Sequence, residues 1–235
     1  MMTRMTHSTN STPSDEESLV LVRRTEATGK WRPLICAEFE GAPSLYLTAE
    51  DWVDCGLKVG MRMSVKQYAD LERRAKVAQA LREALKLLEV RPRFEGELSR
   101  ALLRKGWERE VIDGALVRLR EKGLLNDEKL VRDRVEAWAG TRSRREIRAK
   151  LRSRGAPTLL VTQSLESCVD DEREREAALR LAEKYFRRAA GRLADVDERR
   201  ALMHLVRKGF SPSIARQAVR ETVRRLGEQE VDPWA

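Results

Sequence analysis

The sequence predicts a mainly α-helical protein, in which tandem three-helix repeats form an elongated, curved array behind a small N-terminal module that contains β-strands. The main observation is a short phrase that occurs three times, as LLRKGW, KLRSRGA and HLVRKGF, each with Leu four residues before Gly. From about Lys76 onward, apolar residues recur at helical spacing. Before that point, short β-favouring segments alternate with turn residues.

The composition favours helices over a β-sandwich or a barrel. Charged residues make up 36% of the chain, hydrophobic residues 41% and aromatic residues only 5%. High charge with few aromatic side chains is typical of amphipathic helices, whose apolar stripes form cores of modest size. The length of 235 residues accommodates a small leading domain followed by an array of repeats.

The N-terminal module is expected over residues 18–75, after a polar tail at residues 1–17 that we expect to be disordered. The segments SLVLVRR, WRPLICAEFE and PSLYLTA carry β-favouring residues and predict short strands. Gly29 and the segment EGAPS supply turns between them. The head of the chain is therefore a small module that contains β-strands.

The same module contains two helix starts. Thr48 is expected to cap a short helix, with Asp51 at its third helical position and Gly56 at its end. Ser64 is expected to cap the long helix that follows. This long helix leads from the module into the repeats.

Alignment of the three phrases on Gly106, Gly155 and Gly209 reveals an internal repeat. These glycines are separated by 49 and 54 residues, and apolar residues recur four positions before, five after and ten after each of them. The pattern indicates repeated units of a lead helix, a second helix closed by Gly, and a third helix. The expected boundaries are residues 76–125 for repeat 1, 126–171 for repeat 2 and 172–226 for repeat 3, followed by a tail at residues 227–235.

Helix-breaking and helix-starting residues divide each repeat into its helices. In repeat 1, Pro92 breaks the lead helix, and the third helix is expected from about Glu108 to Gly123. Asn126 or Asp127 is expected to open the lead helix of repeat 2.

The third helices of repeats 2 and 3 have their own start signals. In repeat 3, Ser211 is followed by Pro212 at the expected first helical position, and Pro157 is expected to play a similar role in repeat 2.

The net charge of +9 is unevenly distributed. Residues 1–75 have a balance of −1, whereas residues 76–235 have a balance of +10. A basic body behind a neutral head predicts a polyanionic partner: a nucleic acid, a nucleoprotein or, less favourably, a membrane surface. The alternative is a soluble helical protein from a GC-rich genome, whose arginines are only solvated.

Two groups of basic residues are candidates for binding a polyanion. In repeat 2, residues 142–154 hold seven Lys/Arg against one Glu, and four-residue spacing places three arginines of the second helix on one face. In repeats 1 and 3, Arg-Lys closes the second helix, where cations also favour the helix dipole and so have an architectural alternative. The full set of candidates is Arg142, Arg144, Arg145, Arg148, Arg152, Arg154, Arg104, Lys105, Arg207 and Lys208.

The sequence lacks signatures of catalysis and of cofactor binding. It contains no phosphate-binding Gly-rich loop, no His/Cys cluster at metal-ligand spacing and no nucleophile elbow. Cys36, Cys55 and Cys168 are far apart, which predicts reduced thiols rather than a disulfide framework. We therefore expect no enzymatic activity, no cofactor and no metal.

The sequence also predicts a cytoplasmic protein. No apolar run approaches the ~18 residues of a membrane-spanning helix. The polar N-terminus lacks the apolar core of a signal peptide.

The order and spacing of these features resemble the RecX family, whose members modulate the bacterial recombinase RecA. The resemblance is carried by ALLRKGWEREVIDGALVRLREKGLLND in repeat 1, TRSRREIRAKLRSRG in repeat 2 and LVRKGFSPSIARQAV in repeat 3. Its GLLND link is similar to the family's junction between the first two repeats. The match covers residues 76–226 well and residues 18–75 more loosely, through DWVDCGLKVGMRMS.

The resemblance implies a non-catalytic regulator. Members of the family bind along the groove of the filament that RecA forms on single-stranded DNA, and they limit its growth or favour its disassembly. They thereby restrain strand exchange, ATP turnover and the co-protease activity of the SOS response. The implied partners are the RecA filament and single-stranded DNA, bound directly or within the filament, and we expect a monomer. An array of helical repeats offers a long, shallow, curved surface for this task.

A second hypothesis is a direct DNA-binding protein, such as a transcriptional or nucleoid factor, because three-helix units resemble helix-turn-helix modules. The third helices would then read bases with polar residues near their starts. Those starts are EREVID, PTLLVTQ and SPSIARQ, of which the first is acidic and the second largely apolar. Only the third helix of repeat 3 therefore remains a candidate for reading bases. A third hypothesis, a helical scaffold, predicts no DNA binding and no salt-dependent partner.

Overall fold

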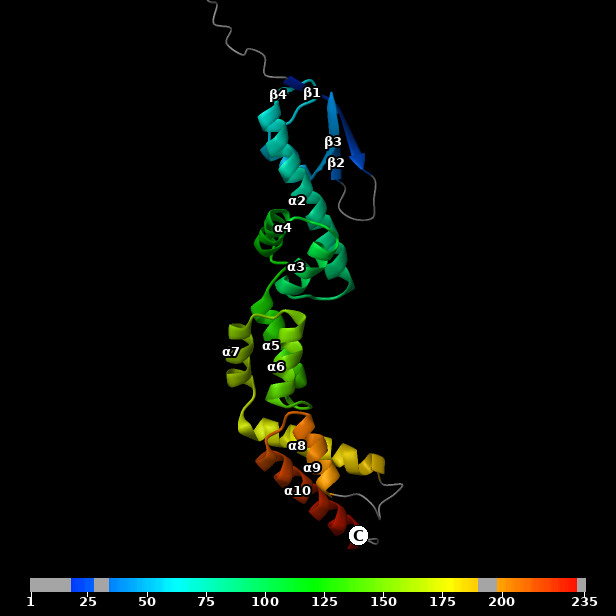
Figure 1. Cartoon of the computed structure of the whole chain (residues 1–235), viewed down its shortest axis with the longest axis vertical. Helices are drawn as coiled ribbons and strands as arrows, with labels where there is room; N and C mark the ends of the chain where they lie inside the picture. Colours follow the sequence, from blue (N-terminus) through cyan, green and yellow to red (C-terminus); the bar gives the residue numbers. More distant parts are fainter. Residues whose placement is uncertain (1–17, 28–33, 190–197, 232–235) are drawn as a thin grey trace, which may run out of the picture. The chain divides into compact units, whose positions relative to one another are not determined.

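A computed structural model of the chain describes residues 18–27, 34–189 and 198–231. The structure is mainly helical and has an N-terminal four-stranded antiparallel sheet, which confirms the predicted fold class (Figure 1). The expected tail at residues 1–17 and the expected turn at Gly29 lie outside the described residues.

The chain divides into two compact bodies. The N-terminal body contains the described residues up to Glu89 together with Leu102–Arg118. The C-terminal body contains Val90–Ala101 together with the described residues from Leu119 onward. Repeat 1 contributes to both bodies, whereas repeats 2 and 3 belong wholly to the C-terminal body.

The sheet has the strand order β3-β2-β1-β4, with neighbouring strands antiparallel. Its strands are β1 (Ser18–Ala27), β2 (Leu34–Glu40), β3 (Ala42–Leu47) and β4 (Arg62–Ser64). The first three lie within or across the predicted segments. The sequence does not predict β4, because three residues are too few to show alternation.

Ten helices follow or interrupt the strands in the described part of the chain. They are α1 (Ala49–Asp54), α2 (Val65–Val90), α3 (Glu95–Arg104), α4 (Arg109–Glu121), α5 (Asp127–Ala139), α6 (Arg144–Arg154), α7 (Thr158–Cys168), α8 (Asp171–Ala189), α9 (Glu198–Arg207) and α10 (Pro212–Val231). Repeats 1, 2 and 3 consist of α2–α4, α5–α7 and α8–α10. Helix α10 continues into the segment that is expected to be a tail from residue 227. Among the described residues, no helix is both long and apolar enough to span a membrane.

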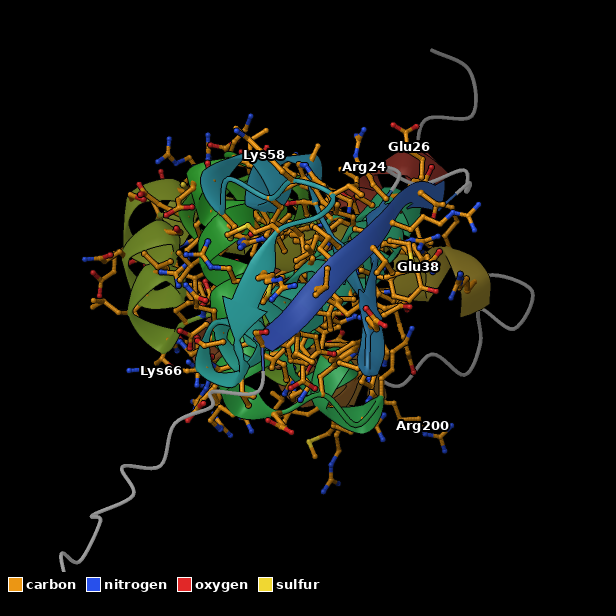
Figure 2. All side chains as sticks on the ribbon, turned by 90° about the horizontal axis from the view of Figure 1, so that it is seen from above. Arg24, Glu26, Glu38, Lys58, Lys66 and Arg200 are labelled. Carbon is orange, nitrogen blue, oxygen red and sulfur yellow. The ribbon has the colours of Figure 1, made fainter. Side chains whose placement is uncertain are left out.

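One face of the sheet packs against the first turns of α2 (Figure 1). Leu21 of β1 and Phe39 of β2 are buried there with Leu71 and Ala75 of α2. Polar side chains of the same body point to solvent, as Figure 2 shows for Lys58 and Lys66, and for Arg24 beside Glu26 at 3.6 Å. The burial of one apolar face therefore orients the module on the long helix.

The predicted helix caps of the N-terminal body are present. Thr48 Oγ1 accepts the Asp51 N–H at 3.0 Å, and the Asp51 carboxylate accepts the Thr48 N–H at 3.4 Å, which closes a capping box. Ser64 Oγ accepts the Gln67 N–H at 3.3 Å, and Gln67 Oε1 accepts the Ser64 N–H at 2.8 Å. Helix α2 ends at Val90, two residues before Pro92, as predicted.

The helix caps that the sequence predicts in the C-terminal body are found in the structure, except at Pro157. Asn126 Oδ1 accepts the Lys129 N–H at 2.8 Å and opens α5, and Ser211 Oγ accepts the Ile214 N–H at 3.2 Å. Pro212 is the first residue of α10, as predicted. The prediction for Pro157 is wrong by one position: it is the capping residue before α7, without a side-chain hydrogen bond, and not the first helical residue.

Helices α5, α6 and α7 lie side by side in repeat 2 (Figure 1). Their shared core holds Val131, Ile147, Leu151 and Val161, and Phe94 joins it from the turn before α3. In repeat 3, the cores hold alanines of α8 together with larger side chains of α9 and α10.

The repeated phrase is a helix-ending motif. The three repeat glycines, Gly106, Gly155 and Gly209, have φ of +88°, +92° and +93°. The Leu four residues before each glycine is buried, and its carbonyl oxygen accepts the N–H of the residue after the glycine at 3.0 to 3.2 Å. This 6→1 bond with a left-handed glycine is the Schellman arrangement, which satisfies carbonyls at a helix end. The prediction that Gly closes each second helix is therefore confirmed.

The repeat glycines differ in what surrounds them. A Cβ on Gly155 would lie 3.1 Å from the backbone of Glu97 and of Gly96 at the start of α3. A Cβ on Gly209 would lie 2.7 Å from Ser143 Oγ at the start of α6. A Cβ on Gly106 would meet nothing within 4 Å among the described residues. The second and third glycine turns thus pack on the preceding repeat's second helix.

We expect Gly155→Ala to destabilise the protein more than Gly106→Ala. Both substitutions force Ala into the left-handed region, at a cost of about 1–2 kcal/mol. Only Gly155→Ala also pushes a methyl group into backbone that cannot rotate away, which adds about 1–3 kcal/mol. Urea denaturation of the two variants measures the difference, and equal losses of stability would contradict this packing of the Gly155 turn.

Candidate functional site

Helix α6 carries the most basic segment of the chain and is held in a fixed rotation. Ile147 and Leu151 are buried in the core of repeat 2. Ser143 caps the helix by accepting the Glu146 N–H at 3.0 Å, and Gly155 closes its last turn. These contacts decide which arginines of the helix face solvent.

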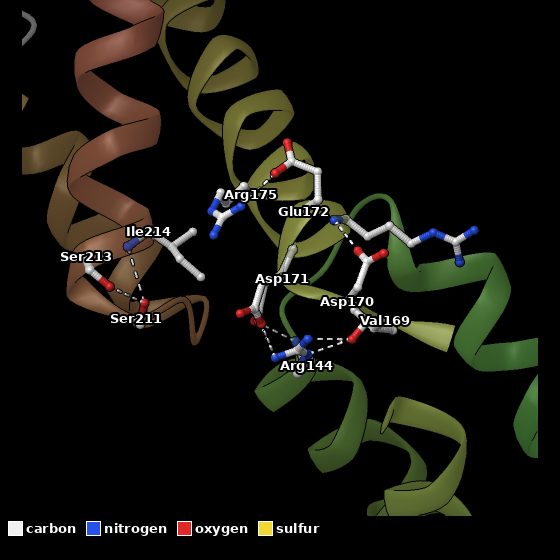
Figure 3. A network of polar contacts seen from close by, with 11 residues as sticks. Arg144, Val169, Asp170, Asp171, Glu172, Arg175, Ser211, Ser213 and Ile214 are labelled. Carbon is white, nitrogen blue, oxygen red and sulfur yellow. Dashed lines mark hydrogen bonds and ion pairs between the residues drawn. The ribbon is translucent and has the colours of Figure 1, made fainter. Parts of the chain in front are cut away.

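Arg144 does not lie on a free surface. Its Nε and Nη2 donate to the carbonyl oxygen of Val169 at 2.9 and 2.5 Å, and its Nη1 lies 2.9 Å from Asp171 Oδ1 (Figure 3). The same nitrogen is 3.5 Å from Glu174 Oε2. Arg144 therefore ties α6 to the start of α8, and it is already paired inside the protein.

The exposed residues of α6 include Arg145, Arg148 and Arg152. These positions are three and four residues apart, so they share one side of the helix. Within the described part of the chain, none of the three side chains has a hydrogen bond or an ion pair. Four-residue spacing relates Arg144 to Arg148 and Arg152, but the contacts of Arg144 with Val169 and Asp171 leave Arg145 as the unpaired arginine beside them.

Arg142 and Arg154 lie next to Trp138, at the end of α5. Their guanidinium carbons are 5.3 and 5.8 Å from the centre of the indole ring. Arg142 also donates to Glu146 at 2.7 Å. Stacking on an aromatic ring holds a guanidinium in place while leaving donors at its rim. Trp138 is not predicted from the sequence, because Arg142 lies in the link after α5 and Arg154 lies 16 positions away.

The fold brings the basic residues at the end of the second helix of repeat 3 next to α6. Ser143 Oγ donates to the carbonyl oxygen of Lys208 at 2.7 Å, and a Cβ on Gly209 would lie 3.0 Å from Arg145 Cβ. The segment that carries the exposed residues Arg207 and Lys208 therefore lies against the start of α6. We call Arg145, Arg148, Arg152, Arg207 and Lys208 the basic surface.

The pKa of His204 is consistent with positive charge at the basic surface. Burial lowers the pKa of His204, and the positive charges of Lys208 and Arg207 lower it further. A proton on His204 is disfavoured because it would add charge to a surface that is already positive. Polyanions are the natural partners of such a surface.

Arg104 and Lys105 lie in the N-terminal body. Lys105 forms an ion pair with Glu83 of α2, which also contacts Lys86 at 2.7 Å. Hydrogen bonds from these two lysines hold the pKa of Glu83 below its ordinary value. The charge of Lys105 is thus compensated within the fold, whereas Arg104 is exposed and has no such contact among the described residues.

No cluster of three or more metal-binding side chains exists in the described part of the chain. Cys36, Cys55 and Cys168 are free thiols.

Comparison with known proteins gives a consistent result. The model of the first three-helix domain of RecX matches residues 80–119, and the model of the third three-helix domain matches residues 171–219. Regulatory protein RecX of Amycolatopsis mediterranei is 33% identical over 153 residues, which cover 61% of this chain and 82% of that protein. Regulatory protein RecX of Mycobacterium sp. (strain JLS) is 35% identical over 163 residues, which cover 65% and 85%.

Two crystal structures share the fold. A regulatory protein RecX superposes with a TM-score of 0.64 at 22% identity, over 83% of this chain and 98% of that chain. RecX from Lactobacillus salivarius superposes with a TM-score of 0.54 at 21% identity, over 63% and 96%. The sequence relatives are regulatory proteins of a non-catalytic family, which confirms the prediction that the chain is not an enzyme. The family models and the relatives together establish that this chain belongs to the RecX family.

Proposed function

We propose that this chain regulates RecA by binding the RecA filament on single-stranded DNA through the basic surface. Binding limits filament growth and thereby lowers ATP turnover, strand exchange and the co-protease activity of the SOS response. Membership of the RecX family supports the choice of RecA as partner. The basic surface supports the choice of a polyanionic target.

The observation that carries the proposal is a surface of five exposed cations from two repeats, none of which has an ion pair among the described residues. Arg145, Arg148 and Arg152 come from α6, while Arg207 and Lys208 come from the end of α9. Each phosphate that they neutralise releases condensed counterions, so the affinity falls with salt. If all five contact single-stranded DNA, the slope of log K against log salt is about −3.5.

The third helices do not support major-groove binding by all three repeats. Glu108 and Glu110 are exposed at the start of α4, and Leu159 is 68% exposed near the start of α7. In repeat 3, Arg216 and Gln217 are exposed near the start of α10, which keeps direct duplex binding as the second candidate function for that repeat alone.

The single-stranded-DNA-dependent ATPase rate of RecA from the same organism tests the proposal, with this protein titrated in. We expect inhibition below one protein per recombinase, because a regulator of filament growth acts substoichiometrically. Binding to naked single-stranded and duplex DNA is recorded in parallel at two salt concentrations. An unchanged ATPase rate together with tight, salt-dependent duplex binding would favour the second candidate function.

A further inference from the structure

The start of α3 is capped by a carboxylate from the next repeat. Asp127, in the first turn of α5, accepts the Glu95 N–H with both oxygens, at 3.0 and 3.3 Å. The residue before α3 is Phe94, whose side chain cannot accept a hydrogen bond. The amides at a helix start need acceptors and carry partial positive charge, so an anion is favoured there.

The start of α6 is capped in the same way by repeat 3. Glu174, in the first turn of α8, is 7% exposed and accepts the Arg144 N–H at 3.1 Å. Its other oxygen lies 3.5 Å from Arg144 Nη1. In both joints, therefore, an acidic residue of a lead helix binds the first amide of the preceding repeat's second helix.

Each of these helix starts makes a second contact with the same following repeat. The Gly155 turn of repeat 2 packs on the backbone of α3 beside Gly96, and the Gly209 turn of repeat 3 packs on Ser143. The start of each of these helices is thus contacted by a carboxylate and by a glycine turn of the following repeat. Two contacts at separate points on a rigid helix restrict rotation as well as translation.

We propose that Glu174 is a positioning residue that fixes the angle between repeats 2 and 3 and thereby holds the two parts of the basic surface together, and that Asp127 positions α3 on repeat 2 in the same way. Glu174 binds the first residue of α6, whose following turns carry Arg145, Arg148 and Arg152. It stands on α8 of the repeat in which Arg207 ends α9 and Lys208 follows it. The part of the proposal that concerns binding rests on the proposed function.

The first turns of the lead helices supply matched controls. Glu172 of α8 is exposed and pairs with Arg175 of its own helix at 2.6 Å. Glu128 of α5 is exposed and pairs with Arg132 of its own helix at 3.0 Å. Neither carboxylate has a hydrogen bond or ion pair to another repeat among the described residues, so their removal changes charge without touching a joint.

Distance measurement between spin labels tests the positioning role in the full-length chain. The three cysteines are replaced by Ser, and labels are placed on Lys129→Cys of α5 and Gln217→Cys of α10, both exposed. We expect Glu174→Ala to broaden the distance distribution about twofold and to weaken binding to the RecA filament about three- to tenfold. Glu172→Ala should change neither quantity.

Two further variants separate positioning from folding. Glu174→Asp keeps the charge, but its shorter side chain no longer reaches the Arg144 amide. This variant should therefore broaden the distribution of spin-label distances as well. Glu174→Gln keeps an acceptor at the same reach and should restore a narrow distribution and near-normal binding. If Glu174→Ala does not fold, the Asp and Gln variants decide the question.

The outcomes are distinct. A narrow distribution in folded Glu174→Ala and Glu174→Asp overturns the positioning role. A broad distribution with unchanged filament binding overturns the link between the joint and the basic surface. If the unmodified chain does not bind the filament at all, the proposed function fails, and the distance distributions alone still decide whether Glu174 positions the repeats.

Discussion

Replacement of Asp51 by Ala is expected to lower the free energy of unfolding by about 3–5 kcal/mol, the largest effect of any single substitution that we consider. Asp51 of α1 is 1% exposed. Arg118 of α4 donates to both of its oxygens, at 2.6 and 2.9 Å, and Thr48 donates to it at 2.6 Å. Removal of the carboxylate leaves the guanidinium of Arg118 without its partner and also breaks a capping box.

The pair also makes stability depend on pH. Burial raises the pKa of Asp51, but the hydrogen bonds from Arg118 and Thr48 and the charge of Arg118 outweigh it, so the pKa lies below its ordinary value of 3.8. Because the folded pKa is below the unfolded one, the ionised carboxylate stabilises the protein at any pH above the ordinary value. This contribution is lost as the pH falls through the lowered pKa.

Urea denaturation of three variants measures this contribution. Asp54→Ala removes an exposed carboxylate from the end of the same helix and should change stability by less than about 0.5 kcal/mol. The double variant Asp51→Ala with Arg118→Met should recover part of the loss, because no unpaired charge remains buried. A loss below about 1 kcal/mol for Asp51→Ala would show that the pair does not hold α1 against α4.

Local chemistry explains why much of the fold is readable from the sequence. Helix caps and glycine turns use residues within four positions of one another. The pairs Thr48 with Asp51 and Leu151 with Gly155 can therefore be recognised in the sequence itself. The expected boundary at Pro157 differs by one residue, because nothing local separates a cap from a first helical position. The short strand β4 is defined only by its pairing with β1.

Contacts between residues that are far apart in the sequence cannot be predicted in this way. Arg118 meets Asp51 across 67 positions, Ser143 meets Lys208 across 65, and neither pair has a local signal. Asp127 and Glu174 look like ordinary acidic residues of a first helical turn. Their partners are set by the way in which one repeat packs on the next.

The pairing of Arg144 follows from the apolar positions of α6. Ile147 and Leu151 are the apolar residues of α6, and Arg144 stands three and seven positions before them, on the same side of the helix. Charge spacing identifies residues that share a face, but the apolar positions decide whether that face is exposed.

Simultaneous replacement of Arg145, Arg148 and Arg152 by Ala is expected to weaken binding to the RecA filament about 10- to 100-fold near physiological salt. Each lost phosphate contact removes about 0.7 from the salt slope on single-stranded DNA, so the slope should become shallower by about 2. The three side chains have no partner in the described part of the chain, so the variant should retain its stability.

A charge-matched control distinguishes this surface from net charge. Lys129, Arg132 and Arg175 are exposed residues of α5 and α8 outside the basic surface, and their replacement by Ala removes the same charge. This control should bind the filament within about threefold of the unmodified chain, since charges beyond a Debye length are largely screened. Arg144 stays unchanged in both variants because it supports the fold.

Equilibrium binding to immobilised RecA filaments decides whether the basic surface binds the filament. The unmodified chain, the α6 variant and the charge-matched control are compared. The filaments are assembled on single-stranded DNA with a non-hydrolysable ATP analogue, and binding is recorded over a series of salt concentrations. We expect a large loss of affinity and a shallower salt slope for the α6 variant alone. Equal affinities and slopes for the α6 variant and the control would contradict the assignment of filament binding to the basic surface.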